Sequence, residues 1–163
     1  MDKLEREILD VLGGDCRYSA EKIAVMLGES EETVQSAIRA LEKRGVIVKY
    51  AAISNLAEEE DECVEALIEV KVTPQSGSGF DGIADEIAQH DEVKNLYLMS
   101  GAYDFAVIVE SKSIKSVSRF ISECISTFDC VISTATHFIL KKYKIEGALT
   151  RKTGNERRLS VQA

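Results

Sequence analysis

The sequence lacks the features that define several large protein classes. No apolar run approaches the length of about 20 residues that a membrane-spanning helix needs, and the opening residues MDKLEREILD are charged rather than apolar. We therefore expect a cytoplasmic protein without a membrane segment. The sequence also has no nucleophile elbow, P-loop or Rossmann glycine pattern, so a conventional enzyme is a disfavoured interpretation.

Metal-binding and disulfide patterns are missing as well. The two histidines, His90 and His137, have no partner at metal or catalytic spacing; we interpret His90 as a polar helix end and His137 as a strand residue packed at an interface. No cysteine has C-x-x-C spacing or pairs with a histidine, and two of them sit in apolar patterns, so buried thiols are predicted. We expect no metal, cofactor or disulfide. The four cysteines are Cys16, Cys63, Cys124 and Cys130.

The charge is acidic but unevenly distributed. The chain has 163 residues, 45% of them hydrophobic, which suits one globular domain or two small ones. Its net charge of −8 argues against a general polyanion binder. Residues 1–60 carry eight Lys or Arg against thirteen Asp or Glu, residues 61–150 eight against fourteen, and residues 151–163 four against one. Any positive field must therefore be local.

Residues 19–50 contain two short amphipathic helical patterns separated by a turn of a few residues. Ala24 is small enough for a close helix crossing, and Gly28 tolerates positive φ at the bend. Ser30 is placed to cap a second helix that begins at Glu31 and ends near Gly45. This pattern favours a DNA-binding helix-turn-helix over a piece of an ordinary helical bundle. The shared core is predicted to contain Ile23, Leu27, Val34, Ile38 and Leu41.

Flanking segments complete this first domain. A helix is expected from about Lys3 to Gly13, closing a three-helix unit. The segment Val46–Ile53 alternates weakly and is β-branched at its start, so we predict a strand and hence a winged helix-turn-helix. An acidic run over residues 58–62 then marks a solvated boundary.

From residue 64 on, apolar and polar residues begin to alternate, as they do in a half-buried strand. The apolar pattern predicts strands over 64–72, 93–99, 105–109 and 131–140. Apolar residues at helical spacing predict helices over 80–87 and 114–128. The order βαββαβ is the ferredoxin-like arrangement, a four-stranded antiparallel sheet with both helices on one face. The fold class is α+β. We expect Thr, Tyr and aliphatic side chains on the uncovered face, which favours pairing with a second subunit.

These patterns divide the chain into four parts. We predict a winged helix-turn-helix domain over residues 1–54, an acidic linker over 55–62, a ferredoxin-like domain over 63–146 and a basic tail over 147–163. The tail contains Arg151, Lys152, Arg157 and Arg158. A terminus of this composition is disordered or touches DNA or a neighbouring subunit.

The helix from Glu31 is the candidate recognition helix. Side chains pointing away from its apolar face can reach base edges, and Gln35 and Arg39 are the best candidates for readout, because Gln pairs with adenine and Arg with guanine. The full set for base contact is Ser30, Thr33, Gln35, Ser36 and Arg39. Nearby basic residues are candidates for phosphate contacts, although each is as readily explained as a solvated surface charge. They are Arg17, Lys22, Lys43, Arg44 and Lys49.

Several stretches resemble, in order and spacing, the Lrp/AsnC (feast/famine) family of prokaryotic transcription regulators. They are LEREILDVL, GDCRYSAEKIAVMLGES, VQSAIRALEKRGVIVKYAAI, the tetrapeptide GAYD at residues 101–104 and STATHFILKKYK at residues 133–144. The resemblance covers nearly the whole chain. It implies binding to double-stranded DNA, a dimer that assembles further to a tetramer or octamer, and a small-molecule effector, commonly an amino acid, bound between sensing domains.

The resemblance also implies where the effector binds. The family's pocket lies around the Gly-x-Tyr-Asp loop, here Gly101, Ala102, Tyr103 and Asp104. Asp104 would hold an ammonium group and the loop amides a carboxylate. A structural role is the alternative, with Gly101 providing turn geometry and Asp104 capping the turn. Two strand hydroxyls, of Thr134 and Thr136, would add contacts or simply reflect β-propensity.

Two departures from the family weaken the expected DNA contact. Many members have an apolar residue after the turn glycine, where this chain has Glu29, and the recognition helix opens with Glu31 and Glu32. Glutamates at a helix N-terminus suit the helix dipole, but they also repel phosphates. Weaker or more selective DNA binding is the expected result.

Two other functions compete with a DNA-binding regulator. Sirohaem decarboxylases resemble the same family in both domains, but tetrapyrrole chemistry should leave more His or Arg than this chain has. A DNA-silent module that senses metabolites is the other alternative, because the recognition helix is acidic. Failure to bind tetrapyrrole would remove the first, and DNA retention at low salt would remove the second.

Overall fold

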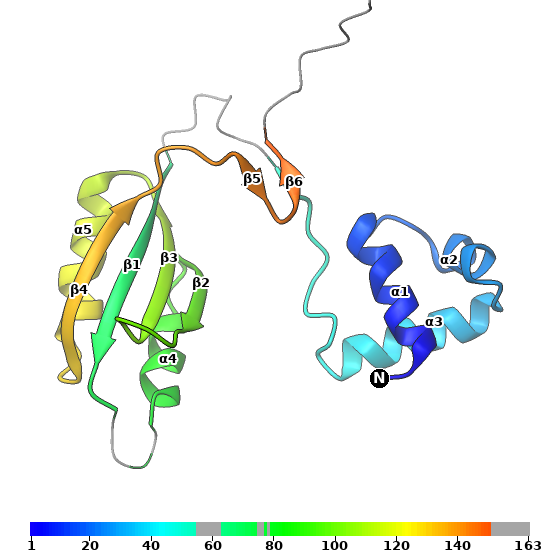
Figure 1. Cartoon of the computed structure of the whole chain (residues 1–163), viewed down its shortest axis with the longest axis horizontal. Helices are drawn as coiled ribbons and strands as arrows, with labels where there is room; N and C mark the ends of the chain where they lie inside the picture. Colours follow the sequence, from blue (N-terminus) through cyan, green and yellow to red (C-terminus); the bar gives the residue numbers. More distant parts are fainter. Residues whose placement is uncertain (55–62, 75–76, 78, 151–163) are drawn as a thin grey trace, which may run out of the picture. The chain divides into compact units, whose positions relative to one another are not determined.

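The computed structural model describes residues 1–54, 63–74, 77 and 79–150. The chain divides into two compact units, Met1–Ser54 and Asn55–Ala163, and each is described by itself (Figure 1). The expected acidic linker at 55–62 and the tail residues 151–163 lie outside the described residues. None of the helices within the described residues combines the length and apolar character that a membrane span needs.

The first unit consists of three capped helices, α1 (Lys3–Gly14), α2 (Ala20–Leu27) and α3 (Glu31–Lys43). Asp2 and Glu5 form a reciprocal capping box at α1, and Ser19 caps α2. The predicted cap of α3 is confirmed, since the Thr33 N–H donates to the Ser30 hydroxyl at 3.1 Å. Each cap satisfies a backbone donor that the first helical turn leaves without a partner.

The predicted bend between α2 and α3 is also confirmed. Gly28 follows α2 with φ 72°, in the left-handed region, and Ala24 is buried where the helices meet. Leu27 and Ile38 are partly buried against the core of this unit. The fully buried members of that core are Ile8, Ile23, Val34 and Leu41.

The strand predicted over Val46–Ile53 is absent, so this part of the prediction is wrong. Gly45, at φ 69°, ends α3 in a Schellman motif: its N–H donates to the Glu42 carbonyl at 2.9 Å, and the Val46 N–H donates to the Leu41 carbonyl at 2.9 Å. The chain after it is extended but has no strand to pair with among the described residues of this unit, and one extended segment alone forms no ladder.

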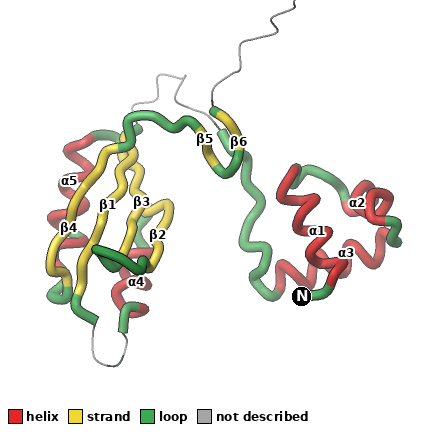
Figure 2. Tube along the Cα trace, viewed as in Figure 1, coloured by secondary structure: helices red, strands yellow, loops and turns green. Residues whose placement is uncertain are grey.

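The second unit contains the predicted four-stranded antiparallel sheet, in the order β2-β3-β1-β4 (Figure 2). Its strands are β1 (Val64–Val72), β2 (Val93–Leu98), β3 (Phe105–Ser111) and β4 (Val131–Phe138). Helix α4 (Asp81–Ala88) packs against β2, and α5 (Ile114–Glu123) packs against β1 and β3. The predicted helix over 114–128 is shorter than expected, because Cys124 breaks it and a 3₁₀ turn, η2 (Ile125–Thr127), follows.

Strand register fixes which side chains lie under the helices. Ile68 and Val70 of β1 belong to the core of this unit, and they pair directly with Thr136 and Thr134 of β4. Directly paired residues share a face, so both threonines lie on the helix side. The expectation that Thr residues line the uncovered face is therefore wrong. That face contains Leu67, Glu69, Tyr97, Ala106, Ile108, Ala135 and His137.

A second, two-stranded sheet follows β4 and was not predicted. Strands β5 (Lys144–Ile145) and β6 (Ala148–Leu149) pair antiparallel around Glu146 and Gly147, whose φ values are 44° and 83°. Two consecutive residues at positive φ are typical of the type I′ turn that suits a two-residue hairpin. Residues 147–150, predicted to begin the basic tail, therefore belong to an ordered hairpin.

The four cysteines are free thiols with different exposure. Cys130 is buried, Cys16 and Cys124 are partly buried, and Cys63 is exposed, so the prediction of a buried thiol at Cys63 is wrong. Cys63 immediately precedes β1 and is outside the sheet that would have covered it. Burial raises the pKa of the Cys124 thiol, and the nearby Glu92 and Glu123 carboxylates add to this shift. Within the described ranges no cluster of three His, Cys, Asp or Glu residues is arranged to hold a metal.

Substituting Gly28→Ala should destabilise the first unit by about 1–2 kcal/mol, because an L side chain disfavours the left-handed region. A Cβ at this position would meet no atom within 4 Å, so the cost is that of the backbone alone. Gly13→Ala is the matched control: it lies within α1, also in open space, and should stabilise by about 0.5–1 kcal/mol. Thermal unfolding followed by circular dichroism measures both. Equal shifts for the two variants would contradict the assigned role of Gly28.

Candidate nucleic-acid interface and ligand-sensing loop

On the exposed face of α3, two side chains that the sequence predicts for base recognition are hydrogen-bonded to each other. One Arg39 guanidinium nitrogen donates to the Gln35 side-chain oxygen at 3.2 Å, and both residues are exposed. They lie four residues apart and therefore on one side of the helix. The pair offers amide and guanidinium groups together, the two chemistries that recognise adenine and guanine in the major groove.

The other predicted base-contact residues of α3 differ in how free they are. The Ser30 and Thr33 hydroxyls lie 2.7 Å apart, and Ser30 also caps the helix. Ser36 is exposed, and its hydroxyl has no hydrogen-bond partner among the described residues. Ser30 and Thr33 therefore support the helix start, while Gln35, Ser36 and Arg39 remain available to a ligand.

Three of the five predicted phosphate contacts already have partners inside the first unit. Arg17 forms a bidentate ion pair with Asp15, at 2.9 and 2.7 Å, and hydrogen bonds from Arg17 hold the pKa of the Asp15 carboxyl well below its usual range. The Lys22 ammonium lies 4.0 Å from the centre of the Tyr18 ring. Lys43 and Lys49 have no ion-pair partner among the residues that the structure describes. A phosphate at Arg17 has to compete with Asp15.

Arg44 is a structural residue in this unit. One guanidinium nitrogen donates to Glu5 at 2.7 Å, and Nε donates to the Ala40 carbonyl at 3.3 Å. The Glu5 side chain is only 11% exposed and receives the Asp2 N–H on its other oxygen. The pair links the start of α1 to the end of α3. Sequence reasoning missed it, since Glu5 and Arg44 lie 39 positions apart.

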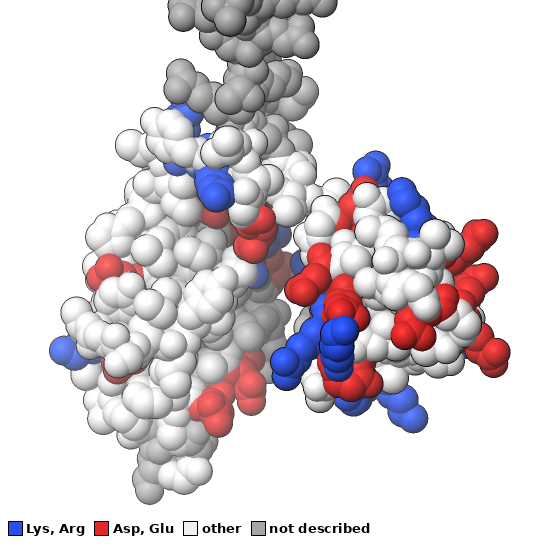
Figure 3. All heavy atoms as spheres, turned by 45° about the vertical axis from the view of Figure 1, so that its right-hand side comes forward, with Lys and Arg blue, Asp and Glu red and all other residues white. Residues whose placement is uncertain are grey.

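Tyr50 is a second link that the sequence did not indicate. Its hydroxyl donates to the Glu42 carboxylate at 2.9 Å, joining the extended segment to α3. Burial raises the pKa of the Tyr50 phenol, and the hydrogen bond to Glu42 raises it further. Acidic and basic side chains are interspersed over the visible face of this unit (Figure 3).

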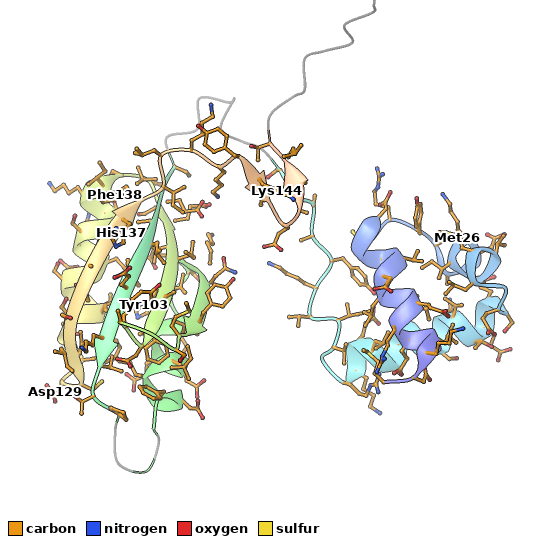
Figure 4. The ribbon with its side chains drawn as sticks, in the orientation of Figure 1. Met26, Tyr103, Asp129, His137, Phe138 and Lys144 are labelled. Carbon is orange, nitrogen blue, oxygen red and sulfur yellow. The ribbon has the colours of Figure 1, made fainter. Side chains whose placement is uncertain are left out.

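In the second unit, Asp104 is tied to the central strand. Its carboxylate accepts the Val72 N–H at 2.8 Å, its own N–H donates to the Val70 carbonyl at 3.0 Å, and its carbonyl accepts the Met99 N–H at 2.7 Å. Gly101 does not have positive φ, so turn geometry does not require a glycine there. Tyr103 and Asp104 are partly buried, while Gly101 and Ala102 are exposed (Figure 4 labels Tyr103).

The predicted effector residues do not form one pocket within a single chain. Val70 pairs with Phe105 on one side and Thr134 on the other. Thr134 therefore lies two strand spacings, about 10 Å, from the strand that follows Asp104. Thr136 is two residues further along β4. Within one chain the threonines are therefore separated from the loop by the width of β1.

Two open cavities lie away from this loop. One, of about 530 Å³, is at the edge of the sheet beside α5 and is lined in part by Glu92, Glu110, Arg119 and Glu123. The other, of about 1170 Å³, lies in the first unit between the end of α1 and the extended segment 46–53. Neither is lined by Gly101–Asp104.

Family comparison covers both units. The model of the AsnC-type helix-turn-helix domain matches residues 1–42, and that of the Lrp/AsnC ligand binding domain matches residues 65–149. The chain belongs to the Lrp/AsnC family. As an Lrp/AsnC protein it combines a helix-turn-helix DNA-binding domain with an α+β ligand-binding domain, as the sequence predicted.

Relatives of this Lrp/AsnC chain are transcription regulators. It is 43% identical over 158 residues to the uncharacterised HTH-type transcriptional regulator YugG of Bacillus subtilis, covering 96% of this chain and 95% of that protein. An uncharacterised HTH-type transcriptional regulator of Pyrococcus horikoshii is 32% identical over 139 residues, 85% of each chain.

Solved structures share the Lrp/AsnC fold. The leucine response regulatory protein LrpA of Mycobacterium tuberculosis superposes with a TM-score of 0.76 at 23% identity, over 93% of this chain and 100% of that one. A transcriptional regulator of Neisseria meningitidis in complex with L-Met superposes with a TM-score of 0.69 at 21% identity, over 89% and 93%.

Arg44→Ala should lower the stability of the first unit by about 1 kcal/mol, a figure reduced because Arg44 itself is half exposed. Its loss removes the closer of two cations from the mostly buried Glu5 carboxylate and leaves only the N-terminal ammonium of Met1, 4.0 Å away. Lys43→Ala removes the same charge one residue earlier and should leave stability nearly unchanged. Urea unfolding of the two variants measures the difference; identical midpoints would show that the Arg44–Glu5 pair contributes nothing.

Proposed function

We propose that this chain is a homo-oligomeric, sequence-specific transcription regulator whose DNA binding responds to an amino acid. The observation that carries this proposal is the exposed Gln35–Arg39 pair on α3 of a helix-turn-helix domain. The pair presents base-reading groups where a recognition helix enters the major groove. Binding to the chromosome places the protein in the cytoplasm, and no enzymatic activity is proposed.

Dimerisation through the uncovered sheet face supports binding to two DNA half-sites. This face exposes Tyr97, 51% accessible, beside the partly buried Leu67 and Ile108. Glu69 and His137 also lie on this face, with their side chains 3.4 Å apart. A two-fold pair of chains presents two recognition helices, as a pseudo-palindromic operator requires. Further assembly to a tetramer or octamer belongs to the same proposal.

The amino-acid effector is proposed to bind at the Gly101–Asp104 loop, with Thr134 and Thr136 contributed from a neighbouring chain. One Asp104 carboxylate oxygen accepts the Val72 N–H, and the other is proposed to receive the effector's ammonium group. The family's ligand-binding domain and the L-Met complex of the Neisseria relative support this choice of ligand class. Which amino acid fits depends on side chains from both chains.

The first experiment is binding of the purified protein to a DNA duplex from upstream of its own gene, as a salt series with and without the twenty amino acids. Specific binding that the amino acids alter would support both halves of the proposal. Amino-acid binding without DNA retention at low salt would instead indicate a DNA-silent sensing module.

Arg39→Ala should relax sequence preference, costing about 1–3 kcal/mol on the operator and little on random DNA. Lys43→Ala should weaken binding to every sequence alike, since a phosphate contact reads no base. Competition between operator and random duplexes, measured by fluorescence anisotropy, separates the two effects. Equal losses for both variants would contradict the assignment of Arg39 to base readout.

Asp104→Ala should lower stability by about 2 kcal/mol, because it leaves the buried Val72 N–H without an acceptor. Asp104→Asn is the matched variant: its amide oxygen can still accept that N–H, but its charge is lost. We expect near-normal unfolding and at least a tenfold weaker amino-acid response for Asp104→Asn, a change of about 1.4 kcal/mol. Calorimetric titration and thermal unfolding measure both, and an unchanged response would exclude Asp104 as the ammonium-binding group.

A further inference from the structure

The hairpin β5–β6 concentrates positive charge in an otherwise acidic chain. Residues 141–150 carry three Lys against one Glu, whereas residues 1–54, which include the helix-turn-helix, carry eight Lys or Arg against ten Asp or Glu. The three lysines, Lys141, Lys142 and Lys144, lie at the start of the hairpin. We call residues 141–150 the cationic hairpin.

The cationic hairpin is held firmly at its base. Lys142 forms an ion pair with Glu65 of β1, and the Ile139 N–H donates to the Glu65 carbonyl at 2.8 Å. At the other end, the Thr150 N–H donates to the Tyr143 carbonyl at 3.2 Å, and the Thr150 hydroxyl donates to the Lys142 carbonyl at 2.5 Å. These bonds join the hairpin to β1 and its two ends to each other, and they leave most of its remaining side chains exposed.

Two of its lysines are left for a partner. Lys141 and Lys144 are exposed and have no ion-pair partner among the residues that the structure describes (Figure 4 labels Lys144). Tyr143, 64% exposed, lies between them in sequence, with its ring centre 5.3 Å from the Lys141 ammonium. Two unpaired ammonium groups and a phenol hydroxyl are the donors that contact phosphate oxygens.

From this geometry we infer that the cationic hairpin is a second DNA-contact surface, which binds the phosphate backbone outside the operator bases. The inference rests on the proposed function, because it assigns a further surface to the same DNA complex. In the helix-turn-helix unit, Arg17 and Arg44 are paired internally and the start of α3 is acidic. Lys43 and Lys49 remain there without an ion-pair partner among the described residues, and Lys141 and Lys144 of the hairpin add two more cations that can contact phosphates.

The test is the salt dependence of DNA binding by the full-length double variant K141A/K144A. Each lost phosphate contact lowers the slope of log K against log salt by about 0.9, so we expect the slope to fall by about 1.8 per bound chain. The loss should be equal on an operator duplex and on a random duplex of the same length. The variant K141R/K144R, which keeps the charge, should retain the original slope.

K112A/K115A is the matched control, since both lysines are exposed and lie just before and within the first turn of α5. It removes the same charge from the same unit and should leave the slope unchanged. Equal slope losses in control and test variants would overturn the proposal, because they would reflect net charge alone. Analytical sedimentation measures the oligomer size of the same variants. A change of oligomer size in K141A/K144A alone, with an unchanged slope, would assign the hairpin to a contact between chains.

These measurements distinguish failure of the hairpin proposal from failure of the proposed function. If the wild-type protein binds operator and random DNA equally, sequence-specific regulation fails, while a selective slope loss in K141A/K144A still supports the hairpin. If operator preference is normal and the slope does not change, only the hairpin proposal fails. No binding to either duplex at any salt would overturn both.

Discussion

Pairing of β1 along both of its edges is the constraint on which the second unit depends. Successive side chains of β1 point to opposite faces of the sheet. Because β3 and β4 both pair with β1, each of their paired residues lies on the same face as its partner in β1. The same strand provides the amide and carbonyl that hold Asp104 and the carboxylate that holds Lys142. The candidate sensing loop and the cationic hairpin are thus both positioned by hydrogen bonds and ion pairs to one central strand, β1.

The structure of the first unit depends on how the ends of its helices are capped. Serine and aspartate caps start its three helices, and glycines at positive φ end two of them. The Arg44–Glu5 pair and the Tyr50–Glu42 hydrogen bond then tie distant segments to α3. Charged groups that look like DNA contacts in the sequence are partly used to hold the recognition helix in place.

Local rules predicted most of the fold. Helix caps, the left-handed Gly28 and the strand alternation of Val64–Val72 depend on neighbouring residues, so the sequence indicated them correctly. The wrong predictions concern features that depend on residues far apart in the sequence. A strand at Val46–Ile53 needs a partner that no local pattern guarantees, and the placement of Thr134 beneath the helices follows only from its register with Val70.

The sequence indicated which residues belong to the candidate sites, but not which other residues they bond to. Gln35 and Arg39 were identified from helix spacing, yet the engagement of Arg17 by Asp15 requires knowledge of rotamers, and that of Arg44 by Glu5 requires the tertiary fold. The β5–β6 hairpin was missed because Glu146 is not a residue that marks a tight turn. Its lysines, Lys141, Lys142 and Lys144, were therefore assigned to the end of the ferredoxin-like domain, and residues 147–150 to the tail.

The hydrogen bond between Gln35 and Arg39 also bears on how this protein can change over evolution. Because each side chain orients the other, a substitution at one position alters the conformations open to the second. Under the proposed base readout, the effects of single substitutions on operator preference will then not add. A new DNA specificity would be reached most easily by substituting both positions together, because a change at one position limits which residues the other can accept.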